Sequence, residues 1–232
     1  MLNVSNLSSN YGNIQAVRHV DLTVAPGAMV ALIGANGSGK STTLKTLAGM
    51  HEPASGTVTF KGMDVTGWPT HRLVRQGLAF LMERPTSVVA PLTVQENLEL
   101  SAAARRTDIS EKLAEMFELF PRLKDRRRQH AGTLSGGEQQ MVAIARVLMT
   151  GPELMLVDSP ATGLAPAIVD EVYETITALH KNGLSILFIE QNAEMALVVS
   201  DYTYLLHRGE IAVEGPSSEL RGSQDVVDAY LA

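Results

Sequence analysis

Residues 34–41 carry the clearest chemical signal in the sequence. They read Gly-Ala-Asn-Gly-Ser-Gly-Lys-Ser, match the P-loop pattern and lie between the apolar run Met29–Ile33 and a helix-forming run. The glycines let consecutive backbone N–H groups face phosphate oxygens, and the next helix presents its positive N-terminus to the same anion. We therefore predict a nucleotide site with Mg²⁺. The residues predicted to bind the nucleotide are Gly34, Asn36, Gly37, Ser38, Gly39, Lys40, Ser41 and Thr42. Lys40 is predicted to reach the terminal phosphates, and Ser41 to coordinate Mg²⁺.

Asp158 is a second candidate, because it follows the four apolar residues Leu154–Val157. Such a run predicts a buried strand that delivers a carboxylate to its C-terminal end, where α/β sheets bind ligands. Taken alone, an Asp in this position is more often a helix cap or a turn residue. Together with the P-loop, it is the expected Mg²⁺ partner of Ser41.

A third motif, Leu-Ser-Gly-Gly-Glu, predicts another anion site at a helix start. Ser135 can cap the helix, and the two glycines leave backbone N–H groups exposed. The motif resembles the signature of ABC ATPases, and the resemblance covers essentially the whole chain. In that family the signature closes over ATP held by the P-loop of the opposite subunit, which implies a dimer with composite sites. The signature residues are Leu134, Ser135, Gly136, Gly137 and Glu138.

Further positions of the chain resemble members of the same family. Tyr11 occupies the place of an aromatic residue that stacks on adenine. Glu83 replaces a Gln that contacts Mg²⁺ and the membrane subunit, and Gln191 replaces the His that senses the γ-phosphate. These features, with Gly163–Pro166, resemble the branch that serves branched-chain amino-acid importers. Urea and short-amide importers use similar subunits and remain an alternative.

Ser159 departs from the family pattern, which places a catalytic Glu after the metal-binding Asp. A hydroxyl is not a useful base near neutral pH, so we expect tight MgATP binding and slow hydrolysis. The resemblance assigns the catalytic positions to Ser159, Gln191 and Glu83. Neither Glu83 nor Glu190 is an obvious replacement base. A heterodimer could keep one competent site by pairing the partner's P-loop and Glu with residues 135–138 of this chain.

The elements that must position these residues alternate in the manner of an α/β protein. We expect a P-loop NTPase fold of the ABC type as a single domain, 1–232. It has a mainly parallel core sheet, an antiparallel β part and a helical subdomain inserted at about 84–150. Predicted strands are 2–7, 20–24, 29–33, 57–60, 78–81, 154–157, 185–189, 202–206 and 210–214. Predicted helices are 40–48, 70–76, 94–104, 110–120, 136–150, 166–182, 193–200 and 225–232.

Composition narrows the range of functions. With 45% hydrophobic and 19% charged residues the chain is typical of a globular protein. The formal net charge of -6 argues against nucleic acid as a partner, and the basic run Arg122–Arg128 is interpreted as a solvated patch. The absence of Cys excludes disulfides and thiol chemistry. We expect neither export nor a membrane span.

The resemblance implies a place for the protein in the cell and a set of partners. It implies the cytoplasmic face of the membrane, transmembrane permease subunits, a second ABC ATPase subunit and, indirectly, a periplasmic or extracellular solute-binding protein. Two other classes of protein agree less well with the sequence. A soluble ABC ATPase of translation would need a coiled coil or a second cassette, and a non-hydrolysing regulatory module rests on Ser159 alone.

Overall fold

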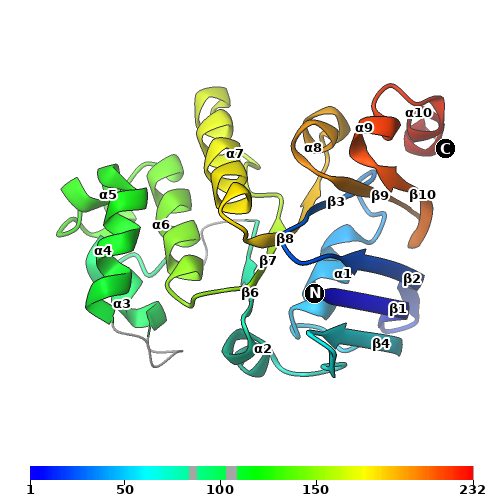
Figure 1. The fold of residues 1–232 in the computed structure, drawn as a ribbon, viewed down its shortest axis with the longest axis horizontal. Coiled ribbons are helices and arrows are strands. Elements are labelled where there is room, and N and C mark those ends of the chain that lie inside the picture. The colour runs from blue at the N-terminus through cyan, green and yellow to red at the C-terminus, as the bar shows by residue number, and fades with distance from the viewer. Residues whose placement is uncertain (84–87, 103–108, 232) are drawn as a thin grey trace.

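The computed structural model describes residues 1–83, 88–102 and 109–231. Two sheets and a group of helices make up the fold (Figure 1). The larger sheet has the order β10-β9-β3-β8-β7-β6. Its strands β3, β6, β7, β8 and β9 pair in parallel, and β10 pairs antiparallel with β9. These strands are β3 (Met29–Ile33), β6 (Leu78–Leu81), β7 (Leu154–Asp158), β8 (Ser185–Glu190), β9 (Tyr202–His207) and β10 (Glu210–Pro216).

The smaller sheet is antiparallel and has the order β2-β1-β4-β5. Its strands are β1 (Leu2–Tyr11), β2 (Ile14–Val24), β4 (Ser55–Phe60) and β5 (Met63–Asp64). Strands β1 and β2 are longer than predicted, because their polar ends pair as a hairpin that closes at Tyr11 and Ile14. Apolar alternation marks only the inner part of each strand, so it underestimated their length.

Successive side chains of β3 point to opposite faces of the larger sheet, and each face is covered by its own hydrophobic cluster. Every residue of β3 is buried, which accounts for its continuous apolar sequence. Met29, Ala31 and Ile33 face the cluster covered by the helical subdomain and α7 (Pro166–Lys181). Val30 and Leu32 face the cluster shared with the antiparallel sheet and α1 (Lys40–Leu47). Helix α1 therefore packs between the two sheets, where it contacts β1, β2, β7 and β8.

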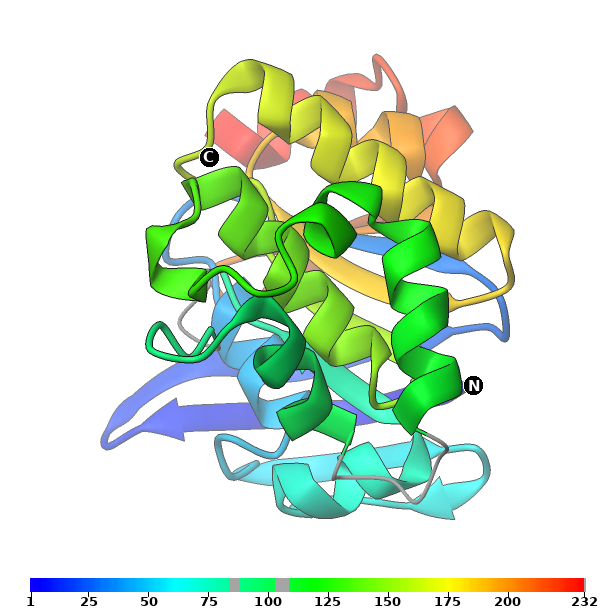
Figure 2. The same cartoon turned by 90° about the vertical axis from the view of Figure 1, so that its left-hand side faces the viewer.

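The inserted helices lie on one side of the molecule, and Figure 2 views them face on. They are α3 (Val94–Ala102), α4 (Ile109–Leu119), α5 (Pro121–Asp125), the 3-10 turn Ala131–Thr133 and α6 (Gly136–Leu148). Helix α5 and the 3-10 turn are additions to the prediction. The predicted linker residues 84–87 and the predicted helix end at 103–104 lie outside the described residues.

The remaining helices follow strands of the larger sheet or lead into them. Helix α2 (Thr70–Gln76) precedes β6, and α8 (Ala193–Val199) follows β8. Helices α9 (Ser217–Leu220) and α10 (Gln224–Leu231) follow β10, and in Figure 1 α9 lies beside α8 with α10 beyond it. The carboxyl ends of β3, β7 and β8 meet at one edge of the sheet, which is where a ligand site is expected.

Candidate functional site

The P-loop connects β3 to α1 in a conformation that depends on glycine. A Cβ on Gly34, whose φ is +150°, would lie 2.2 Å from the Leu206 carbonyl oxygen. A Cβ on Gly39, whose φ is +109°, would lie 2.5 Å from the Ala16 carbonyl oxygen. Neither residue can therefore carry a side chain without a shift of the backbone.

Lys40 points back into the loop that it follows. Its Nζ donates to the carbonyl oxygens of Gly34 at 2.7 Å and Ala35 at 2.8 Å. Burial lowers the pKa of Lys40, and the negative charges of Asp158 and Glu190 partly offset this effect. The ammonium group thus lies where the phosphates of a nucleotide would be cradled.

A buried hydroxyl in the loop also indicates an anion. Ser38 Oγ is buried and has no hydrogen-bond partner among the described residues. A buried polar group of this kind costs free energy unless a ligand or water satisfies it. A phosphate oxygen would provide that partner, so the loop fits the predicted nucleotide.

Asp158 and Ser41 place two hard oxygen ligands side by side. Ser41 Oγ lies 3.5 Å from Asp158 Oδ1, and Asp158 is only 4% exposed. Burial raises the pKa of Asp158, and the charge of Glu83 raises it further, whereas Lys45 and hydrogen bonds from Ser159 and Ser41 lower it. A bound Mg²⁺ would compensate this buried charge, and Mg²⁺ takes one or two carboxylates together with phosphate oxygens. The donor set therefore fits Mg²⁺.

One cavity of about 350 Å³ brings together residues from distant parts of the sequence. The P-loop and its helix contribute Asn36, Gly37 and residues 39–42. Glu83 after β6, Ser159 after β7 and Gln191 after β8 line the same cavity. These are the positions that the sequence analysis assigned to the phosphates and to the catalytic step.

Ser159 lies at the cavity with a constrained backbone. Its φ is +41°, and the residue is 4% exposed. Its N–H donates to the Ile189 carbonyl oxygen at 3.1 Å, and its own carbonyl oxygen accepts from Thr162 N–H at 3.2 Å. The backbone is thus fixed between the ends of two neighbouring strands, and its side chain supplies a hydroxyl where a base is expected.

Glu190 is engaged in holding the segment 190–192. Its Oε1 accepts from the backbone N–H groups of Gln191 at 2.7 Å and Asn192 at 3.1 Å. Its Oε2 accepts from the Tyr173 hydroxyl of α7. Asn192 in turn caps α8 by accepting from Met195 N–H at 3.1 Å. Both carboxylate oxygens of Glu190 are therefore used to hold this segment.

The signature segment forms a complete capping box at the start of α6. Ser135 Oγ accepts from Glu138 N–H at 3.3 Å, and Glu138 Oε2 accepts from Ser135 N–H at 2.9 Å. The hydrogen bond from the Ser135 backbone is the main reason why the pKa of Glu138 is lowered. Arg126, from the basic run, pairs with Glu138 at 2.7 Å. None of the residues 134–138 lines the P-loop cavity.

Tyr11 does not line the cavity. It is 49% exposed and stacks on His51, with ring centroids 4.4 Å apart. The predicted contact with adenine stays a prediction. The sequence reasoning gave no role to His51, whose Nε2 bonds the Asn10 carbonyl oxygen at 3.0 Å.

Two tyrosines beside the cavity were also missed. Tyr230 of α10 accepts from Gly34 N–H at 3.1 Å and donates to the Gln191 carbonyl oxygen at 2.9 Å. Tyr173 binds Glu190 as described above. Nothing local in the sequence marks either contact, since each joins elements that are distant along the chain.

The fold and this cavity define a P-loop ATPase. A model described as ABC transporter matches residues 17–162, and the chain belongs to the ABC transporter family. The fold class and the ATPase class predicted from the sequence are thus confirmed.

Relatives extend the similarity over the whole chain. The chain is 42% identical over 232 residues to "High-affinity branched-chain amino acid transport ATP-binding protein BraG" of Pseudomonas aeruginosa, covering 100% of this chain and 99% of the relative. It is 35% identical over 222 residues to "Probable branched-chain amino acid transport ATP-binding protein LivF" of Archaeoglobus fulgidus, covering 95% and 94%.

Solved structures agree with the fold. An ATP-binding cassette of an ABC transporter superposes with a TM-score of 0.89 at 26% identity, covering 100% of this chain and 99% of the other. A nucleotide-free cassette gives a TM-score of 0.87 at 27% identity, with the same coverage.

Proposed function

We propose that the chain is the ATP-binding, energy-coupling subunit of an ABC importer for branched-chain or other hydrophobic amino acids. The observation that carries the proposal is the 42% identity, over the full chain, to a subunit named for branched-chain amino-acid transport. A second relative with the same kind of name supports it at 35% identity. ATP contacts are common to ABC transporters of many cargoes, so the cargo rests on these relatives.

Each cavity residue has a role in this proposal. Backbone N–H groups of the P-loop and the Lys40 ammonium hold the phosphates. Ser41, Asp158 and Glu83 supply oxygen ligands for Mg²⁺, which would neutralise charge that develops on the phosphates. Gln191 contacts the γ-phosphate. The signature residues 134–138 bind the nucleotide of a second subunit, and Tyr11 supports the adenine.

Hydrolysis at this chain's own site is proposed to be slow. General-base catalysis is worth about 10²- to 10⁴-fold in rate, and the Ser159 hydroxyl cannot supply it near neutral pH. The involvement of Glu190 with Tyr173 and two backbone N–H groups supports this view, because it removes one alternative base. In an asymmetric heterodimer, a partner's P-loop and Glu would form the active site with residues 135–138.

ATPase subunits of this family dimerise and work with permease subunits. Within the described part of the chain, none of the helices is both long and apolar enough to cross a bilayer. We propose that the chain binds the cytoplasmic face of a membrane-spanning permease. A solute-binding protein on the other side of the membrane would deliver the cargo.

The proposal is tested by reconstitution of the chain with its permease and solute-binding subunits in proteoliposomes. We expect ATP-dependent uptake of labelled leucine, which Lys40→Ala abolishes and the exposed control Lys181→Ala leaves intact. Uptake of urea or a short amide in place of leucine would contradict the proposal that the cargo is an amino acid. Failure of the chain to bind any permease would overturn the role as a transporter subunit.

A further inference from the structure

The segment 190–192, which carries Gln191, is held from two sides by tyrosine hydroxyls. Tyr173 of α7 donates to Glu190, whose other carboxylate oxygen accepts from the backbone of Gln191 and Asn192. Tyr230 of α10 donates directly to the Gln191 carbonyl oxygen at 2.9 Å. The bonds of Glu190 connect the segment only to α7 and to its own backbone. Tyr230 connects the segment to the P-loop.

The second bond of Tyr230 makes that connection. Its hydroxyl accepts from the N–H of Gly34, the first glycine of the P-loop, at 3.1 Å. Ile33 and Glu190 are partners in the parallel ladder of β3 and β8, so Gly34 and Gln191 are the next residue after each partner. A phenolic hydroxyl can both donate and accept a hydrogen bond, and here it joins the first backbone groups beyond the ladder. Burial raises the pKa of Tyr230, which keeps this hydroxyl protonated and able to donate.

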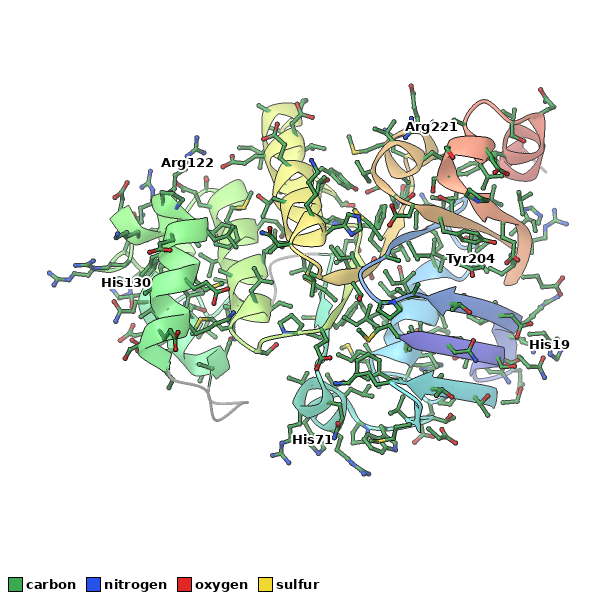
Figure 3. The ribbon with its side chains drawn as sticks, viewed as in Figure 1. His19, His71, Arg122, His130, Tyr204 and Arg221 are labelled. Atoms are coloured by element: carbon green, nitrogen blue, oxygen red, sulfur yellow. The ribbon has the colours of Figure 1, made fainter. Side chains whose placement is uncertain are left out.

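The region that carries Tyr230 is itself fastened to α8. Arg221 donates to the carbonyl oxygens of Leu197 at 3.0 Å and Val198 at 2.9 Å, at the end of α8. Figure 3 shows Arg221 on this side of the molecule, opposite Arg122 and His130 in the helical subdomain. Ser217 of α9 adds a 2.8 Å hydrogen bond to Ser200, directly after α8. Both ends of the segment from Gln191 through α8 are therefore anchored to the region 217–230.

We propose that Tyr230 is a positioning residue of the nucleotide site, which fixes the distance between the P-loop and Gln191 and so makes the site prefer ATP to ADP. The inference rests on the proposed function, in which Gln191 contacts the γ-phosphate. The P-loop holds phosphates that ATP and ADP share, whereas only ATP offers a γ-phosphate to Gln191. If the segment 190–192 is already held in place, it binds the γ-phosphate more tightly than a segment that must become ordered on binding.

A packing role alone would predict a different result. The ring of Tyr230 packs against the core cluster beneath the helices. Tyr230→Phe keeps that ring and removes only the hydroxyl. Loss of packing or of general stability would weaken ATP and ADP alike, whereas loss of the connection to Gln191 weakens ATP selectively.

The experiment measures the Kd of MgATP and of MgADP for the wild-type chain, for Tyr230→Phe and for a matched control. Tyr202→Phe, on β9, removes a phenolic hydroxyl outside the cavity. For Tyr230→Phe we expect the Kd of MgATP to rise about three- to tenfold, the scale of one or two hydrogen bonds, and the Kd of MgADP to change less than about twofold. Tyr202→Phe should change neither value.

A double-mutant cycle with Gln191→Ala tests whether Tyr230 acts through Gln191. If it does, Tyr230→Phe causes no further loss of ATP affinity in the Gln191→Ala background, because the effects of substitutions at coupled residues are not additive. Additive losses, or equal losses for ATP and ADP, would overturn the inference and leave the proposed function standing. Failure of the wild-type chain to bind ATP at all would overturn the proposed function and this inference with it.

Discussion

Two requirements oppose one another at Asp158. Its carboxylate must be ionised to bind Mg²⁺, yet it is 4% exposed and lies near the charge of Glu83. Its pKa is raised mainly by burial. Ionisation is therefore less favourable in the folded chain than in the unfolded chain, and the folded protein binds the proton more tightly.

This predicts that Asp158→Asn stabilises the metal-free protein while weakening its MgATP binding. Between the unfolded and the folded pKa of Asp158, the folded state binds more protons, so the contribution of Asp158 to stability falls as pH rises through this window. The variant should raise Tm at pH 7 by roughly 2–4 °C for each kcal/mol gained. The gain should shrink as pH falls below the folded pKa. Thermal unfolding of both proteins from pH 4 to 8 checks this, and a lower Tm for Asp158→Asn at pH 7 would contradict it.

At the scale of single elements, the start of α6 is fixed by capping hydrogen bonds and by close packing. Ser135 and Glu138 satisfy one another's backbone N–H groups, and Arg126 holds the second oxygen of the Glu138 carboxylate. The side chains of Ser135 and Glu138 therefore bind groups of this same chain. Gly137, which lies between these two residues, has no space for a side chain, because a Cβ there would lie 2.6 Å from Ile168 Cγ2. Close packing against α7 therefore fixes the orientation of this helix start.

Ser135→Ala should lower the free energy of unfolding by about 1 kcal/mol, the usual cost of losing a serine cap. Ser218→Ala, at an exposed position of α9, provides a serine control away from this cap. Urea denaturation of the wild type and both variants gives the comparison. A Ser135→Ala protein as stable as the wild type would show that the capping box contributes nothing to the folded state.

Sequence reasoning succeeded where chemistry follows from a local pattern. The P-loop, the strand that ends at Asp158 and the helix that begins after Ser135 each depend on a few consecutive residues. It failed for Tyr230, whose bonds reach residues 196 and 39 positions away. A tyrosine in an amphipathic helix looks like an ordinary core residue, because only the tertiary fold brings it to Gly34 and Gln191.

At the scale of the whole molecule, the two motifs to which we assign nucleotide binding belong to different parts of the fold. The P-loop cavity is lined by residues from β3, β6, β7 and β8 and their loops, and the signature segment lies at the start of α6 within the helical subdomain. None of the signature residues 134–138 lines the P-loop cavity. A second subunit, placed so that its signature covers this P-loop, would complete the site that we propose.

The consequence of Ser159 for transport depends on which subunit completes the proposed composite site. In a homodimer both sites would contain a hydroxyl in place of the base, and both would be slow. In a heterodimer one site could keep a Glu from the partner, and this chain would then serve mainly to bind ATP and to contribute its signature. The rate at this chain's own P-loop is therefore the quantity on which the account depends.

The most direct measurement is steady-state and single-turnover hydrolysis of MgATP by the purified chain, Ser159→Glu and Ser159→Gln, with ATP affinity measured alongside. Both variants share the backbone strain of a side chain at φ +41°, so only the carboxylate distinguishes them. We predict that the wild type binds ATP and hydrolyses it slowly, that Glu raises the rate by about 10²- to 10⁴-fold, and that Gln does not. A wild-type chain that already turns over as fast as Ser159→Glu would contradict the account, because another group would then be positioning the attacking water.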